Sequence, residues 1–231
     1  MGSDLLVFAY GSLIFDPELP EAVSNHYWAR LDGFARRFNK RSPVRGVVTA
    51  ESWADDPAAS LAFVSRDHAD SLAMGLEPSP TAHVVGRVLV YPKSVASNLI
   101  ARLDAREGYH RGEPLSHSGY VPVVRPVHRL GDGAALDALL YLSNAESSLI
   151  LPPSVPDHER AGILVAATPR HPGTRPAGVD YLAALRRSLA TGGIFDPALE
   201  RQARAVANLG PTWAARVGLP PRPEAAPDAT S

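Results

Sequence analysis

"VFAYGSL", residues 7–13, constrains the fold more than any other stretch of the chain. Residues 5–10 are continuously apolar and rich in strand-forming side chains, and Gly11 and Ser12 interrupt them. A short apolar run that stops at such a pair is typical of a buried strand entering a loop. A turn of this kind can expose consecutive backbone N–H groups, which bind anions such as carboxylates. The sequence therefore predicts a buried strand followed by an anion-binding loop.

"LDAREGYHRG", residues 103–112, predicts the end of a helix that carries a glutamate in its last turn. Residues 94–106 have apolar side chains at every fourth position, and Gly108 is a typical stop signal. The unpaired carbonyl groups of a helix end disfavour an ionised glutamate there by roughly 0.3–1 kcal/mol at exposed sites. Glu107 is therefore either a solvated side chain that pairs with a neighbouring arginine, or a residue placed there for its chemistry.

Composition limits the class of partner. The 231 residues include 23 Lys and Arg against 24 Asp and Glu, a balance that favours a small molecule or a protein over nucleic acid or an anionic membrane. The absence of cysteine excludes disulfides, thiolate nucleophiles and cysteine-containing zinc sites. His110 and His117, seven residues apart in a glycine-rich loop, do not form a metal-binding pattern. We expect no metal and no cofactor.

The order of the predicted elements indicates an α+β fold. Strands are predicted at 5–10, 46–51, 60–65, 83–92, 120–127 and 136–144, and helices at 94–106, 177–193 and 196–210. Pro122 and Pro126 mark their strand as an edge or bent strand, because proline cannot donate to a ladder. Asp196 is the expected N-cap of the last helix. Strands that mostly precede helices, without regular alternation, favour α+β over a doubly wound sheet.

We expect a single domain over residues 1–218. The proline-rich residues 144–176 are predicted to form a long irregular excursion, with a short apolar segment at 163–167. The last residues, 219–231, have too few apolar side chains to offset the entropy of ordering and are expected to be a disordered tail. The early apolar run is too short for a signal-peptide core, and no window has the length of a membrane span. We expect a cytoplasmic location.

Together, "FAYGSL" at 8–13 and "LDAREGY" at 103–109 resemble the γ-glutamylcyclotransferase superfamily, and most of all its ChaC branch. In that family a strand leads into Y-G-S-[LN], and a glutamate in an L-D-x-x-E-G segment is the catalytic acid/base. The matching positions here are Tyr10, Gly11, Ser12, Leu13 and Glu107. Weaker similarities are "GFARRFNKRS" at 33–42, "RGVVTAE" at 45–51, "GRVLVY" at 86–91 and the pair Gly119 and Tyr120.

The resemblance implies a γ-glutamylcyclotransferase-like curved mixed β-barrel with peripheral helices and the site at one mouth. It also implies that a γ-glutamyl amide, glutathione or another γ-glutamyl compound, is cyclised to 5-oxoproline with release of its amine, without metal or cofactor. Glu107 would move the proton, made a better base by the helix end and by partial burial. Residues 10–13 would bind the α-carboxylate. Tyr109 and Tyr120 are candidates for the pocket wall, or else interior tyrosines with satisfied hydroxyl groups.

Two other functions remain open. One is a non-catalytic module of the same fold that binds a small molecule. The other is a hydrolase that uses Ser12 with a histidine, which the absence of a G-x-S-x-G elbow disfavours. Substrate choice is open as well, because Ala9 replaces the usual glycine of the family and residues 144–176 match it poorly. The basic run Arg36, Arg37, Lys40 and Arg41 is expected to be a solvated face, unless one of these residues neutralises a substrate carboxylate.

Overall fold

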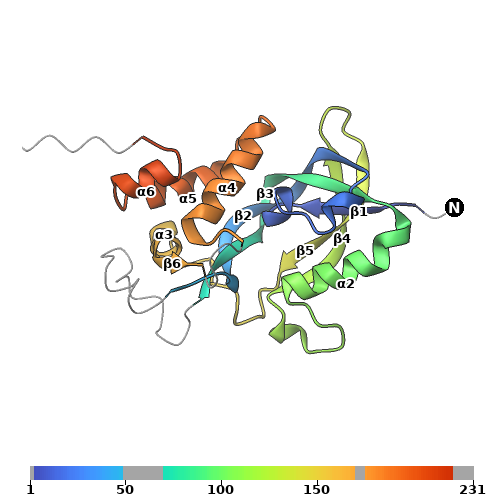
Figure 1. Ribbon diagram of the computed structural model, residues 1–231, viewed down its shortest axis with the longest axis horizontal. Helices are drawn as coiled ribbons and strands as arrows, with labels where there is room; N and C mark the ends of the chain where they lie inside the picture. Colours follow the sequence, from blue (N-terminus) through green and yellow to red (C-terminus); the bar gives the residue numbers. More distant parts are fainter. Residues whose placement is uncertain (1–2, 49–69, 170–174, 221–231) are drawn as a thin grey trace, which may run out of the picture.

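Five strands close into a barrel in the computed structural model, which describes residues 3–48, 70–169 and 175–220 (Figure 1). The strands are β1 (Leu5–Ala9), β2 (Asn25–Val48), β3 (Asp70–Tyr91), β4 (Tyr120–Arg129) and β5 (Ala135–Ser143). They pair in the order β3-β1-β5-β4-β2, and β2 pairs again with β3 to complete the ring. The β1–β5 contact is parallel and the other pairs are antiparallel, so the barrel is mixed.

Strands β2 and β3 are much longer than the sequence predicted. They span 24 and 22 residues and pair along most of their length, with three irregularities in register that bend them. The expected solvated face on β2 is wrong, because Arg36 and Lys40 are buried while Arg37 is only half-buried. The neighbouring Phe38 and Asn39 are buried as well, and the register with β3 shifts between Phe38 and Lys40. The strand predicted at 60–65 lies outside the described residues.

Strand β4 pairs unequally on its two sides. It pairs with β5 over nine positions, from Tyr120 to His128, but with β2 only at His128 and Arg129. The side toward β2 is therefore largely open along the part of β4 that holds Pro122 and Pro126. Proline lacks an N–H group and is tolerated where a strand edge has no partner, so this arrangement agrees with the predicted edge strand.

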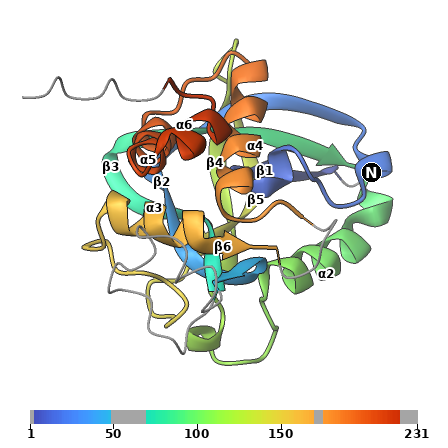
Figure 2. The same ribbon diagram turned by 60° about the vertical axis from the view of Figure 1, so that its left-hand side comes forward.

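Helices cover the outside of the barrel in two places (Figure 2). The helix α2 (Ala96–Glu107) buries Leu99 and Leu103 against the barrel, as its fourfold spacing predicted. The helices α3 (Asp157–Ala166), α4 (Gly178–Thr191), α5 (Pro197–Ala207) and α6 (Pro211–Arg216) form a separate layer on another side. In α5, Asp196 is the N-cap predicted from the sequence, and its side chain accepts hydrogen bonds from two backbone N–H groups.

The proline-rich segment 144–176 is not irregular throughout, which corrects the expectation from its composition. It contains α3 and the short strand β6 (Ala167–Thr168), which pairs with the end of β2. The fully buried Arg160 of α3 donates hydrogen bonds to the carbonyl groups of Pro152 and Val155, and to that of Phe38 in β2. One buried guanidinium therefore satisfies the backbone of the loop and holds it against the barrel.

The C-terminal helical layer extends slightly beyond the predicted end of the domain. The N–H group of Leu219 bonds to the carbonyl of Ala214, and the Leu219 side chain packs against the core. Leu219 is therefore not part of a tail, and residues 221–231 lie outside the described residues. Within the described ranges, no helix is long and apolar enough to cross a membrane.

Candidate active site

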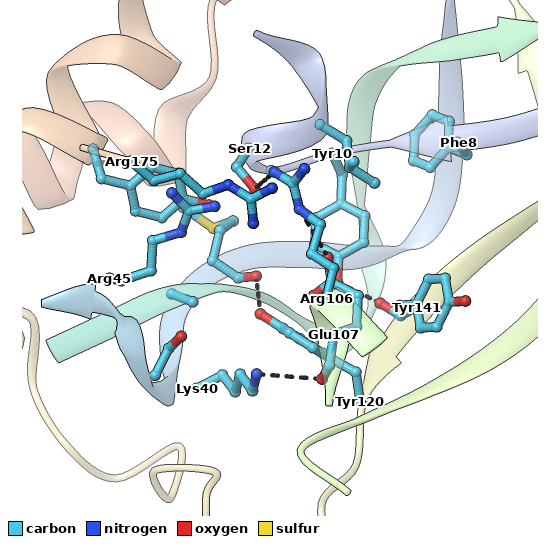
Figure 3. Close-up of a pocket in the computed structure, with 16 residues that line it drawn as sticks. Phe8, Tyr10, Ser12, Lys40, Arg45, Arg106, Glu107, Tyr120, Tyr141 and Arg175 are labelled. Carbon is cyan, nitrogen blue, oxygen red and sulfur yellow. Dashed lines mark hydrogen bonds and ion pairs between the residues drawn. The ribbon is translucent and has the colours of Figure 1, made fainter. Parts of the chain in front are cut away.

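The loop after β1 and the C-terminal end of α2 meet at a pocket in the mouth of the barrel (Figure 3). Strands β2, β3, β4 and β5 and helix α4 complete its wall. The described residues that line it are Phe8, Tyr10, Gly11, Ser12, Leu13, Lys40, Ser42, Arg45, Ala73, Met74, Arg106, Glu107, Tyr120, Tyr141, Arg175 and Tyr181. The structure therefore brings the two motifs of the sequence into one pocket, although about ninety residues separate them in the chain.

The backbone of the loop is arranged to present N–H groups. Residues Ser12–Ile14 form a short 3-10 helix, and in the described structure the N–H groups of Gly11, Ser12 and Leu13 make no backbone hydrogen bond. The buried Arg36 fixes the loop from behind, because its Nε donates to the carbonyl of Tyr10 over 2.8 Å. A Cβ atom on Gly11 would lie 3.1 Å from the hydroxyl of Tyr181. Glycine therefore lets the loop approach the pocket wall closely.

The hydroxyl group of Ser12 is oriented by an arginine. Arg106 donates a hydrogen bond from Nη2 to Ser12 Oγ over 3.1 Å, which occupies an acceptor site of the hydroxyl and leaves its O–H free to donate. None of the described residues that line the pocket is a histidine. Ser12 is therefore placed to donate to an anion, and the pocket wall as described offers no imidazole to deprotonate it.

Glu107 is the last residue of α2, as predicted. Gly108 follows in the left-handed conformation, with φ 69°, and ends the helix. The Glu107 side chain is 16% exposed, and its Oε1 lies 3.8 Å from Arg106 Nε. Lys40 Nζ donates to the backbone carbonyl of Glu107 over 3.4 Å. This cation offsets part of the negative field of the helix end, so the dipole clash predicted from the sequence is weaker than expected.

Tyrosines form much of the pocket wall, and their hydroxyl groups bond within the protein. Tyr120 donates to the carbonyl of Met74 over 2.5 Å, and Tyr10 donates to the carbonyl of Tyr141. Burial raises the pKa of both Tyr10 and Tyr120, and the nearby Glu107 carboxylate adds to the effect. These side chains therefore remain neutral and shape the cavity.

Of the two tyrosines that the sequence suggested for the pocket wall, one lines the pocket and the other does not. Tyr120 lines the pocket, whereas Tyr109 is half-buried against the core and is not among the described lining residues. Tyr109 follows Gly108, which ends α2. Tyr141, which the sequence did not single out, lines the pocket and is held by a 2.6 Å hydrogen bond from its hydroxyl to Asp104.

Comparison with solved structures identifies the fold. A selenomethionine-labelled crystal structure of a yeast γ-glutamyl cyclotransferase specific to glutathione matches with a TM-score of 0.61 and 20% sequence identity, over 89% of this chain and 96% of that one. The chain has the γ-glutamyl cyclotransferase fold. A second crystal structure of a yeast cyclotransferase of the same description matches with a TM-score of 0.57 and 20% identity, over 88% and 98% of the two chains. The barrel predicted from the sequence is thereby confirmed.

The similarity is one of structure. No family model matches the sequence, and no curated protein is similar to it. The structural match establishes the shared fold, and because the sequence identity is only 20%, the chemistry of this pocket has to be argued from its own side chains.

Four cations line the pocket among the described residues, and the sequence analysis did not single out Arg45 or Arg175. Arg106 and Arg175 share the carboxylates of Asp16 and Glu18, at distances of 2.8–3.1 Å. The other two are Lys40 and Arg45 on β2. Lys40 belongs to the basic run in which one residue was expected to neutralise a substrate carboxylate if the run was not a solvated face. Arg175 comes from the segment 144–176, where the family resemblance is weak.

Proposed function

We propose that the protein is a γ-glutamylcyclotransferase, which converts a γ-glutamyl amide such as glutathione to 5-oxoproline and releases the amine. The observation that carries the proposal is that Glu107 and the loop of residues 10–13 face one pocket from two different elements. The cyclotransferase fold supports it, because the same fold is found in the yeast enzyme specific to glutathione.

The loop would bind the α-carboxylate of the substrate. Backbone N–H groups of Gly11, Ser12 and Leu13 are free to donate, and the Ser12 hydroxyl adds a further donor. Hydrogen bonds to a charged acceptor are stronger than those between neutral groups. Glu107 then faces the α-ammonium group, so that the two charges of the amino-acid end fix the orientation of the substrate.

Glu107 would act as both base and acid. Its carboxylate takes a proton from the α-ammonium, and the free amine attacks the γ-carbonyl carbon to form the C–N bond of the lactam. The amide C–N bond breaks as Glu107 returns this proton to the departing nitrogen. The attacking nitrogen loses a second proton as the lactam N–H forms, and this proton also passes to the amine, which leaves as an ammonium ion. No water is consumed, and the carboxylate is regenerated. Holding the amine against the carbonyl supplies the proximity that accelerates ring closure.

The alternatives fit the site less well. A hydrolase would need a base near Ser12, and the described pocket wall contains no histidine. A module that only binds a small molecule would use the loop, but it would gain little from Glu107 alone. The mostly buried carboxylate of Glu107, beside a loop suited to binding an anion, favours the cyclising enzyme.

The test is incubation of the purified protein with a panel of γ-glutamyl peptides, amino acids and amines, with chromatographic detection of products. The proposal predicts 5-oxoproline in an amount equal to the amine released. Free glutamate as the product would indicate a hydrolase instead. A rise in melting temperature with substrate, but no product, would indicate a binding module.

A further inference from the structure

Arg45 is a buried cation of the pocket wall that has no carboxylate partner within the described part of the chain. Its residue is 5% exposed, and its guanidinium carbon lies 4.6 Å from the centre of the Tyr181 ring. Its one hydrogen bond to a described residue, to the carbonyl of Pro176, is 3.5 Å long. A guanidinium has five N–H donors, so most of those of Arg45 have no acceptor among the described residues.

The other cations of the pocket are already engaged. Arg106 and Arg175 form ion pairs in the loop that follows β1. Lys40 donates to the backbone of Glu107 and lies 4.5 Å from the centre of the Tyr120 ring. Burial lowers the pKa of Lys40, and the field of the Glu107 carboxylate partly offsets this. Lys40 and Arg45 thus both lack an ion pair with a described residue, and Arg45 has the larger number of donors without a described acceptor.

The surroundings of Arg45 favour the binding of an anion. Burial lowers the pKa of Arg45. Tyr181 and the Glu107 carboxylate oppose this effect, whereas the nearby guanidinium groups of Arg106 and Arg175 add to it. A buried charge is costly unless it is paired and hydrogen-bonded. A ligand that brings a carboxylate to Arg45 supplies both the counter-charge and the missing acceptors.

We propose that Arg45 is a specificity-determining residue that binds a carboxylate on the amine half of the γ-glutamyl substrate. The inference rests on the proposed function. The γ-glutamyl half has one carboxylate, assigned to the loop 10–13, and one ammonium group, assigned to Glu107. Figure 3 shows Arg45 entering the pocket from the side of β2 and Glu107 from that of α2. A second anion must therefore come from the part of the substrate that leaves.

This assignment selects one class of substrate. A γ-glutamyl amino acid or peptide has a carboxylate on its amine half, whereas a γ-glutamyl derivative of a simple amine has none. A polyamine derivative would bring positive charge toward Arg45 and be repelled. The preferred substrates are therefore γ-glutamyl amino acids or peptides, and Arg45 distinguishes them from γ-glutamyl amines.

A matched pair of substrates tests the role of Arg45. γ-Glutamylglycine and γ-glutamylglycinamide differ only in the replacement of a carboxylate by a neutral amide. In the wild type, kcat/KM should be at least roughly tenfold higher for the acid than for the amide, because one hydrogen bond between charged groups has an effect of this size. Arg45→Gln should lower kcat/KM for the acid by about 10- to 100-fold and hardly change it for the amide. Arg125→Gln, at an exposed arginine of β4, is the control and should keep the preference.

Binding provides a second measurement that does not need turnover. N-Glutarylglycine lacks the α-amine and cannot cyclise, and N-glutarylglycinamide is its neutral partner. Calorimetry should give the acid a dissociation constant about tenfold or more below that of the amide in the wild type. Arg45→Gln should remove the difference. If that variant melts far below the wild type, Arg45→Lys replaces it, since it keeps the charge but loses the planar fork and should reduce the preference.

The possible results of these experiments distinguish a failure of the Arg45 assignment from a failure of the proposed function. Equal kcat/KM for the two substrates in the wild type, or an equal loss for both in Arg45→Gln, would overturn the role of Arg45 while the cyclotransferase activity stands. If no γ-glutamyl compound of the panel yields 5-oxoproline, the proposed function fails, and the role of Arg45 in that reaction fails with it. The calorimetric pair would then still show whether Arg45 binds a carboxylate.

Discussion

The guanidinium of Arg106 joins Ser12 to two carboxylates of the loop that follows β1. Arg106 Nη2 donates to Ser12 Oγ over 3.1 Å and to Asp16 over 2.9 Å, and Nη1 bonds to Glu18 over 2.8 Å. Because Arg106 directly precedes Glu107 in α2, one side chain sets the position of the loop relative to the proposed acid/base. The two motifs of the sequence are therefore in direct contact through this residue.

Arg106→Lys should destabilise the protein, because an ammonium cannot make these bonds together. The Arg106 side chain is 4% exposed, but Asp16 is 36% exposed, so solvent reduces the loss. We expect the free energy of unfolding to fall by about 1–3 kcal/mol, as measured by urea denaturation. Arg111→Lys is the control. That arginine is 68% exposed in its pair with Asp104, so its replacement should change the free energy of unfolding much less. Equal losses in the two variants would contradict the bridging role of Arg106.

Ser12→Ala should weaken substrate binding more than it slows turnover. The hydroxyl is proposed to hold a carboxylate that is present in both the ground state and the transition state. We expect KM to rise roughly tenfold with kcat nearly unchanged, from steady-state kinetics. Ser188→Ala, which removes a hydroxyl bonded within α4, should change neither value. A fall of kcat by orders of magnitude at constant KM would instead point to nucleophilic catalysis by Ser12.

Tyr91 should make the protein sensitive to alkali. Its hydroxyl donates to the carbonyl of Glu18 over 2.7 Å, and burial, with the Glu18 carboxylate, raises the pKa of Tyr91 to about 12 from 10.0. Between these values the unfolded chain has lost a proton that the folded chain keeps. The stability contributed by Tyr91 is therefore complete below pH 10 and is lost as the pH rises through about 12.

Tyr91→Phe tests this dependence. The variant should melt at a lower temperature near neutral pH, because the carbonyl of Glu18 loses its partner. Its melting temperature should then fall less steeply than that of the wild type between pH 10 and 12. Melting curves across this range give the comparison, and parallel declines in the two proteins would show that Tyr91 does not contribute.

Local signals explain what the sequence could predict. The run of residues 7–13 encodes a strand and its turn within seven residues, and the helix before Glu107 has both its periodicity and its stop signal in the chain. Asp196 before Pro197 likewise marks the start of α5, as the structure shows. Each of these features depends on neighbours along the chain, and each was assigned correctly.

Features that depend on distant contacts were missed. Arg45 and Tyr181 are stacked in the pocket although they lie on β2 and α4, and neither position has a distinctive local pattern. The helix α3 lies in a proline-rich segment whose composition suggested a loop. Arg160 of this helix stabilises the segment and donates a hydrogen bond to the carbonyl of Phe38 in β2. The burial of Lys40 depends in the same way on the pairing of β2 with β3, whose register shifts between Phe38 and Lys40.

The most direct test of the central claim is the turnover of Glu107→Gln with the γ-glutamyl substrate that the wild type uses best. Glutamine keeps the shape of the side chain but cannot accept and return the proton, so kcat should fall by roughly 10²- to 10⁴-fold. N-Glutarylglycine should still raise the melting temperature of the variant, since binding to the folded state stabilises it without reaction. Glu113→Gln, at an exposed glutamate, is the control and should retain full activity. A Glu107→Gln protein that keeps more than about a tenth of the wild-type kcat would contradict the assignment of Glu107 as the acid/base.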